Sequence, residues 1–288
     1  GLTAWAVNSL TLNDNDFIFA VNGFRLNVLN DLIIGSGATL GLGAYYGGGT
    51  GFEVNVGGNL VLTNGGRLVV YSGSTNGAGT NHGARLTVAN DIRIGPSSWL
   101  VPYSHGADGG SPLLTMNNLT IEEGGGIDAM GKGYASRKGP GVGRSPQGSY
   151  AGAAGYGGKG GGGGESSFST LGGVAYGSVS APLDAGSGGG CHSSHIYQGG
   201  GGGGLVRIEA AGTVMVRGTI DAAGGNGVEQ YAMPGSGGAI YIRCNTFGGT
   251  AAGLLSVRGG TAYTTNGGAG GGGRIALDYQ NLAASHGA

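Results

Sequence analysis

Charged residues are scarce in this chain of 288 residues. They make up 10% of it, and 14 Lys and Arg against 15 Asp and Glu leave a formal net charge of −1. A nucleic-acid-binding protein needs a basic face to engage phosphates, so this balance argues against that class. The chain has no run of 18 apolar residues, which excludes a membrane-spanning helix. It has only two cysteines, too few to define a disulfide scaffold.

Glycine is the residue in excess. The chain has 73 glycines, about one residue in four, against a usual share of about 7%. They lack the strict period of three that collagen requires. Hydrophobic residues still make up 39% of the chain and fall in ordered, alternating patches, which does not fit a disordered protein. The composition therefore predicts an ordered, glycine-rich protein.

The alternating patches recur as a repeat of two or three short strands. The clearest copies are RLNVLNDLIIGSGATLGL, FEVNVGGNLVLTNGGRLVVY, ARLTVANDIRIGPSSWLV, LLTMNNLTIEEGGGIDAMG and LVRIEAAGTVMVRGTIDAAGG. The expected first inward residues of successive copies are Leu26, Val54, Leu86, Leu114, Val206, Ile240 and Ile275. Because alternate side chains of a strand face the same side, these residues would line an interior and the residues between them would face solvent.

Three short strands per repeat, separated by Gly, Asn and Asp corners, are typical of a right-handed parallel β-helix, or β-solenoid. Gly and Asn suit such corners because they tolerate left-handed backbone angles. We therefore expect an all-β fold in one continuous domain, with solenoid coils in residues 1–130 and 205–288. The alternative fold is an antiparallel β-sandwich, because Asn-Gly pairs such as Asn64-Gly65 are a hairpin signal.

Residues 131–204 lose the repeat and are expected to form a long glycine-rich insertion. One interpretation is a mobile surface loop. The other is packed polyglycine-II strands, extended helices that approach closely because no Cβ intervenes. Aromatic residues such as Tyr134, Tyr156 and Tyr176 favour at least partial order, because such rings usually pack on something. Similar tracts precede later repeats, so we interpret all of them as loops stacked in one glycine-rich flank.

The segments GGGGGGLVRIEAAGTVMVRGTIDAAGGNG, GSGGAIYIRC and GGAGGGGRIALDY resemble the glycine-rich β-helical repeats of large bacterial cell-surface proteins. The resemblance covers residues 113–279, and residues 25–101 are similar to a more ordinary β-helix. It implies an extracellular, adhesin-like protein with a structural or binding role. A second similarity is to polyglycine-II proteins, such as phage tail-tip adhesins and springtail antifreeze proteins.

The segment CHSSH is the densest group of candidate metal ligands. Cys191, His192 and His195 are ligand types that zinc or copper accepts, although no fourth ligand accompanies them. The other interpretation is a disulfide between Cys191 and Cys244. It would tie the insertion to a core strand in an oxidising compartment.

Two pairs of carboxylates are further candidates. Asp14 and Asp16, in NDND, could ligate calcium, although the EF-hand loop pattern is absent and turn formation is the simpler interpretation. No other cofactor is expected. Asp128 and Asp221 occupy equivalent places in GGIDAMG and GTIDAAG, so they would lie on neighbouring coils if the insertion loops out. Paired carboxylates can carry out glycosidic acid–base chemistry, but both could equally face solvent as turn residues.

Aromatic residues late in successive repeats form a last candidate group. Tyr71, Trp99 and Tyr103 could form a strip on which carbohydrate stacks, or an aromatic ladder over the sheet. The residues leave these two interpretations open.

We expect a non-enzymatic extracellular structural protein, either a subunit that stacks end to end into a fibre or an adhesive surface rod. The end of a strand stack is an open edge that invites pairing with another chain. The expected partners are further copies of the chain and, for an adhesive rod, a surface polysaccharide. The alternative is a carbohydrate-active or carbohydrate-binding β-helix module of the lyase or hydrolase kind. An ice- or surface-binding protein is a third class.

Overall fold

The structure is a computed structural model. It describes residues 4–19, 23–43, 51–74, 82–143, 152–162, 171–191, 198–229, 232–263 and 267–283. Within these ranges every regular element is a β-strand, and no helix is present.

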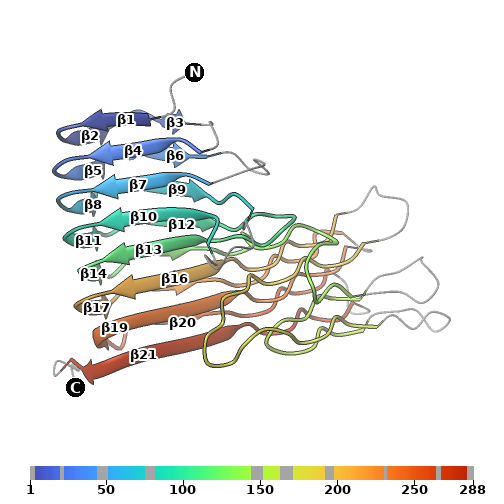
Figure 1. Cartoon of the computed structure of the whole chain (residues 1–288). Helices are drawn as coiled ribbons and strands as arrows, with labels where there is room; N and C mark the ends of the chain where they lie inside the picture. Colours follow the sequence, from blue (N-terminus) through green and yellow to red (C-terminus); the bar gives the residue numbers. More distant parts are fainter. Residues whose placement is uncertain are drawn as a thin grey trace.

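The strands form stacked layers that run from the first strand to the last (Figure 1). In the first six layers each layer has three consecutive strands, here termed first-, second- and third-position strands. The first-position strands are β1 (Ala4–Val7), β4 (Arg25–Val28), β7 (Glu53–Val56), β10 (Ala84–Val88), β13 (Pro112–Met116) and β16 (Leu205–Ala210). The second-position strands are β2 (Leu10–Asn13), β5 (Leu32–Gly35), β8 (Leu60–Leu62), β11 (Asp91–Ile94), β14 (Asn118–Ile121) and β17 (Thr213–Val216). The third-position strands are β3 (Phe17–Phe19), β6 (Thr39–Leu42), β9 (Arg67–Tyr71), β12 (Trp99–Tyr103), β15 (Gly126–Asp128), β18 (Thr219–Asp221) and, in the seventh layer, β20 (Leu254–Ser256).

Two long strands replace this pattern at the end of the stack. β19 (Ala239–Gly249) and β21 (Arg274–Leu282) each run through both the first and the second positions of their layer. β19 pairs with β16 along its first half and with β17 along its second half. β21 pairs with β19 from Arg274 to Leu282.

All named strand pairs are parallel, and they form two sheets. Sheet A has 14 strands. Its hydrogen-bonded path runs down the first-position strands from β1 to β16, turns back through β19, and returns up the second-position strands to β2, with β21 added to β19. Sheet B has seven strands, all in the third position, in the order β20-β18-β15-β12-β9-β6-β3.

The predicted fold class, a right-handed parallel β-helix with a grafted glycine-rich insertion, is therefore wrong as stated. The first- and second-position strands are one continuous, nearly closed, all-parallel sheet joined at β19, not two separate faces. The physical reason lies in β19, which runs as one strand from Ala239 to Gly249 and so passes from the first to the second position without a break. The all-β part of the expectation is confirmed. The antiparallel β-sandwich is also wrong, because every named strand pair is parallel.

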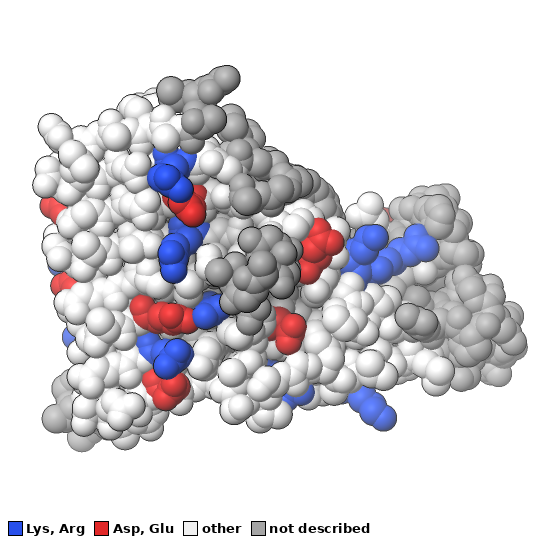
Figure 2. Space-filling model, in the orientation of Figure 1, with Lys and Arg blue, Asp and Glu red and all other residues white. Residues whose placement is uncertain are grey.

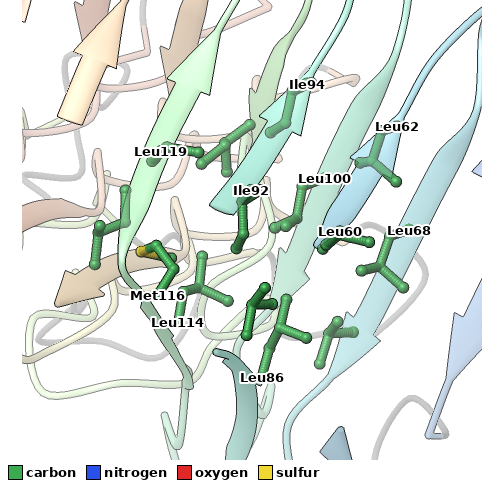
Figure 3. Packing of buried hydrophobic residues seen from close by; sticks show 14 of the residues in the cluster. Leu60, Leu62, Leu68, Leu86, Ile92, Ile94, Leu100, Leu114, Met116 and Leu119 are labelled. Atoms are coloured by element: carbon green, nitrogen blue, oxygen red, sulfur yellow. The ribbon is translucent and has the colours of Figure 1, made fainter. Parts of the chain in front are cut away.

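The hydrophobic core lies between the two arms of sheet A and sheet B. Leu26, Val54, Leu86 and Leu114 share one register column and are at most 1% exposed. Figure 3 shows such side chains from several strands meeting in the interior. Full burial of a Leu or Ile side chain contributes about 1.5–3 kcal/mol, so these columns are the main stabilising feature of the stack.

After residue 204, the residues that continue the inward column lie two positions further along the chain than the sequence predicted. Leu114 pairs with Ile208, and Ile208 pairs with Ile242. The expected residues Val206 and Ile240 are buried too, but they belong to the neighbouring column. The six-residue strand β16 has three inward positions, which is why alternation alone could not fix this register.

The corner between the first and second positions is held by a ladder of Asp and Asn side chains. The Asp31 carboxylate accepts hydrogen bonds from the Asn59 backbone amide at 2.7 Å and from its side chain at 3.1 Å. The Asn118 side chain donates to Asp91 at 2.8 Å and accepts from the Thr213 amide at 2.7 Å. These bonds satisfy backbone groups that a corner would otherwise leave unpaired.

Replacing Asn59 by alanine should lower the free energy of unfolding by about 1–2 kcal/mol, because two side-chain hydrogen bonds to neighbouring layers are lost at about 1 kcal/mol each. Those bonds run to Asp31 and from the Asp91 amide. Urea unfolding measures the change. Asn15→Ala is the matched control, since its side chain bonds only to Asn13 in the same exposed turn. Equal losses in the two variants would show that the ladder does not stabilise the corner.

The Asn64-Gly65 pair forms a tight turn but not a hairpin. Both residues have positive φ, at 49° and 83°. The same left-handed pattern occurs one layer earlier at Ser36 (51°) and Gly37 (77°). These turns connect second-position to third-position strands, which belong to different sheets. The sequence signal was therefore correct for the turn and wrong for the pairing of its flanking strands.

A second hydrogen-bonded unit, here termed the glycine bundle, adjoins the strands of the later layers (Figure 1). Its described residues are 131–143, 152–162, 171–191, 198–204, 222–229, 232–238, 257–263 and 267–273. Successive links run from the Gly225 amide to Gly201, from Gly235 to Gly225 and from Gly260 to Gly235, at 2.7–3.0 Å. The bundle thus joins residues of 131–204 to segments that follow β18 and β20, so the glycine-rich segment packs together with the loops of later layers.

Backbone packing at several glycines of the bundle leaves no room for a side chain. A Cβ added at Gly133, Gly202 or Gly235 would lie well inside van der Waals contact with a carbonyl oxygen of a neighbouring segment. Glycine is therefore required at these positions by the close approach of main chains rather than by an unusual φ.

Candidate functional surfaces

The two ends of the stack are open strand edges. Among the described residues, β1, β2 and β3 each pair with one strand, and so do β20 and β21 at the other end. An unpaired edge presents free N–H and C=O groups to any strand that can align with it.

Apolar side chains are exposed at these ends although their counterparts in inner layers are buried. Leu282, in β21, is 58% exposed, whereas Leu32 and Leu60 in the same column are fully buried. Phe17, in β3, is 45% exposed, whereas Leu40, its partner in β6, is fully buried. Exposed apolar side chains also occur elsewhere, as at Leu29, so the feature specific to the ends is that positions of the core columns are uncovered.

The outer face of sheet B carries the three aromatic residues expected to bind carbohydrate. The rings of Tyr71 and Tyr103 stack with their centroids 4.5 Å apart. The Lys132 ammonium lies 5.0 Å from the centroid of the Tyr103 ring. Trp99 lies over Gly126 of the next layer, where an added Cβ would come within 2.6 Å of the indole. The ring faces thus contact protein groups, which is the geometry of an aromatic ladder.

Asp128 and Asp221 are paired in register on β15 and β18. Each carboxylate accepts a hydrogen bond from the backbone amide two residues later, at 3.0 Å for Asp128 and 2.9 Å for Asp221. Asp128 also lies 3.9 Å from Arg67 and 3.7 Å from Lys132. The structure brings the two aspartates to adjacent layers and engages both in turns, a structural arrangement of Asp that is common in loops.

Both cysteines are buried free thiols in the structure, so the expected disulfide is not formed in it. Cys191 lies in the glycine bundle, where its backbone forms an isolated antiparallel β-bridge with that of Ala232. Cys244 is part of the hydrophobic core and borders a surface hollow. Burial raises the pKa of the Cys244 thiol.

The metal-site hypothesis falls largely outside the described residues, because His192 and His195 do not belong to them. Within the described part of the chain no group of three or more His, Cys, Asp or Glu side chains is placed to hold a metal ion. Of the calcium candidates, Asp16 accepts a hydrogen bond from the Thr39 amide at 2.9 Å, and Asp14 occupies a turn position with φ of 58°. Asp14 thus lies in a bend, and Asp16 links the first layer to the second.

Charged side chains alternate in sign down the face formed by the first-position strands (Figure 2). Arg25 pairs with Glu53 at 2.7 Å, and Arg243 pairs with Asp278 at 3.1 Å. Exposed pairs of this kind contribute about 0–1 kcal/mol each. The alternation keeps like charges apart in a stack whose neighbouring layers lie about 4.8 Å apart.

A buried polar cluster in the glycine bundle was not identified from the sequence, which marked its tyrosines only as packing groups. Ser187 donates to the Tyr176 hydroxyl at 2.9 Å, and the Tyr176 carbonyl accepts from the Arg274 guanidinium at 2.9 Å. The Tyr156 hydroxyl is fully buried without an aligned partner among the described residues. Burial holds the pKa of Tyr156 and of Tyr176 well above the ordinary value. Both rings therefore stay neutral and help to join the bundle to β16 and β19.

Asp184, in the same cluster, should make stability depend on pH. Burial raises the pKa of its carboxyl, and the Arg274 guanidinium partly opposes that rise. The folded state therefore binds this proton more tightly than the unfolded state, so the contribution of Asp184 is most favourable at low pH. It is lost as the pH rises from the unfolded pKa through the folded one.

Asp184→Asn should remove this part of the pH dependence. Relative to the wild type, the variant should gain free energy of unfolding between acid and neutral pH. Urea unfolding at several pH values from 3 to 7 measures the gain. Parallel pH profiles for the two proteins would contradict the assignment.

Comparisons with known proteins give no relative for this chain: no family model matched it, and no curated protein or solved structure matched it either. Within the described part of the chain there is no helix long and apolar enough to cross a membrane. The class that the fold defines is an all-β protein of stacked parallel strands with a hydrogen-bonded glycine bundle.

Proposed function

We propose that this chain is a structural protein of the cell exterior, a subunit of a fibre or of an adhesive surface rod, which assembles through the open strand edges at its two ends. The observation that carries the proposal is the exposure of core-column residues at those edges, with Leu282 the clearest case. The resemblance of its sequence to glycine-rich cell-surface repeats supports the extracellular setting.

Physical chemistry favours assembly at these surfaces. The edges offer main-chain hydrogen bonds, and the exposed apolar side chains gain free energy when a further layer covers them. Natural proteins commonly protect such edges with charged residues or proline. β21 has its charged side chains on the outer face, at Arg274 and Asp278, and leaves Tyr279 and Leu282 exposed.

The proposed function predicts that the wild-type chain forms filaments or chains of copies, and that Tyr279→Lys/Leu282→Lys abolishes them. Two added positive charges at the edge should raise the apparent dissociation constant by at least about tenfold, which corresponds to about 1.4 kcal/mol. Negative-stain microscopy and light scattering at increasing concentration measure the assembly. Met130→Lys is the matched control, because Met130 is 40% exposed and follows β15 in the fifth layer, away from both ends. A wild-type protein that stays monomeric at high concentration would refute the proposal.

Carbohydrate binding or cleavage, the alternative function, has weaker support. The Tyr103 ring, on which a sugar could stack, already contacts both Tyr71 and Lys132. Asp128 and Asp221 are already engaged by backbone amides of their own turns.

A further inference from the structure

The edge of β21 has the same layout as the first two strands of the chain. β21 crosses the first and second positions in a single run of nine residues, Arg274–Leu282. β1 and β2 cover the same two positions between Ala4 and Asn13. Each run therefore spans the corner of sheet A and could lie along the other over its full length.

The side-chain columns of the stack define how the two runs would align. Leu277 is in the column that passes through Ile242, Leu114 and Leu26 to Trp5. Leu282 is in the column that passes through Phe247, Val214 and Leu60 to Leu10. Both alignments follow from one register, so a second copy placed after β21 would continue two core columns at once.

Corner length is compatible with this register. Two residues separate Tyr279 from Leu282 in β21, and two also separate Val7 from Leu10 in the first layer. Corners of two and of three residues pair within the stack, as Val7–Leu10 does beside Val28–Leu32, so corner length permits this junction and the side-chain columns define it.

The geometry points to a head-to-tail junction of fixed register, in which β21 of one copy pairs in parallel with β1 and β2 of the next copy, so that Leu277 lies beside Trp5 and Asp278 beside Ala6. This inference rests on the proposed function and specifies its contact. Sheet A carries the junction, because the last strand of sheet B, β20, belongs to the layer before β21.

A tail-to-tail junction is disfavoured by charge. If two β21 strands paired antiparallel about their centre, Asp278 of one copy would face Asp278 of the other, because it is the middle residue of the strand. Like charges directly opposite each other destabilise a strand pair. In the head-to-tail register Asp278 instead lies beside the uncharged Ala6, and repetition of the junction gives an open filament rather than a closed dimer.

Cysteine cross-linking tests the register. Residues aligned in neighbouring parallel strands lie about 4.8 Å apart, whereas residues shifted by two positions lie roughly 8 Å apart, beyond the reach of a disulfide. Ala6→Cys/Asp278→Cys is the in-register pair, and Ala4→Cys/Asp278→Cys is shifted by two residues. All three positions are on the outer face, and Ala4, Ala6 and Asp278 are exposed. Wild-type protein controls for the native Cys191 and Cys244. Ala276→Cys/Gln280→Cys detects a tail-to-tail contact, because these two residues would face each other in the centred antiparallel pair while Asp278 keeps its charge.

Under mild oxidation the in-register pair should give a ladder of cross-linked multimers at a rate at least about tenfold above that of the shifted pair. Filaments with equal or faster cross-linking in the shifted pair would overturn the register and leave the proposed function intact. Cross-linked dimers from Ala276→Cys/Gln280→Cys would overturn the head-to-tail arrangement. If none of the variants and no wild-type sample assembles, the proposed function itself fails.

Discussion

Replacing Gly202 by alanine should lower the free energy of unfolding by about 3 kcal/mol or more. The added Cβ would lie well inside contact with the carbonyl group of Gly186, and because this is backbone, no side chain can turn aside. Overfilling a packed interior costs about 1–3 kcal/mol. The backbone shift would also strain the hydrogen bond from Gly202 to Tyr134 and the one from Gly133 to Gly202, each worth about 1 kcal/mol.

Gly272→Ala is the matched control for this variant. No heavy atom lies within 4 Å of the position that its Cβ would take, and Gly272 is exposed. Its loss of stability should stay within about 0.5 kcal/mol. Hydrogen exchange adds a second readout. In the Gly202 variant, amides of residues 131–143 and 198–204 should lose protection before those of β5 and β8. Equal losses in the two glycine variants would show that close main-chain packing does not hold the bundle together.

Local alternation made the strand positions readable from the sequence. Leu32, Ile34, Leu60 and Leu62 occupy alternate positions of their strands, and all four are fully buried. The signal is strong there because each strand has only three or four residues between Asn, Asp or Gly corners. The corner residues were correct as well, since Asp31 and Asn59 link neighbouring layers.

The pairing of segments far apart in the sequence could not be predicted. Asn245 suggests a corner by residue type, but in the structure it continues β19, because its amide and that of Thr246 both donate to the Gly212 carbonyl of the previous layer. The partners of the glycine segments could not be predicted for the same reason. Nothing in the local pattern of GGGGGG indicates that Gly202 contacts Gly186 and Tyr134, since these contacts depend on how three separate segments meet.

For the candidate sites too, the positions of residues in the repeat could be predicted, but their contacts with distant segments could not. The sequence placed Tyr71 and Tyr103 in equivalent positions of successive repeats, and the structure stacks their rings. Whether a ring face is free or covered depends on Lys132, which lies in the turn after β15 and reaches Tyr103 from the next layer. The proposed function depends on the strands of the first and last layers, which pair on one side only among the described residues.

Replacing Leu86 by alanine should lower the free energy of unfolding by about 2–5 kcal/mol, the range for a leucine removed from a packed core. Leu86 is fully buried in β10, with Val54 and Leu114 as its partners in the layers on either side. The cavity would therefore open in the middle of the stack, where covering layers hold the neighbouring side chains in place and allow little collapse.

Leu29→Ala is the control for this variant, because Leu29 is 61% exposed and follows β4 at a corner. It should change the free energy of unfolding by no more than about 0.5 kcal/mol. Urea unfolding measures both variants. The Leu86 variant should also lose amide protection in β7, β10 and β13 while the N-terminal layer changes less, since the named strands pair only with strands of adjacent layers. A loss as small as that of Leu29→Ala would mean that the inward columns are not what stabilises the stack.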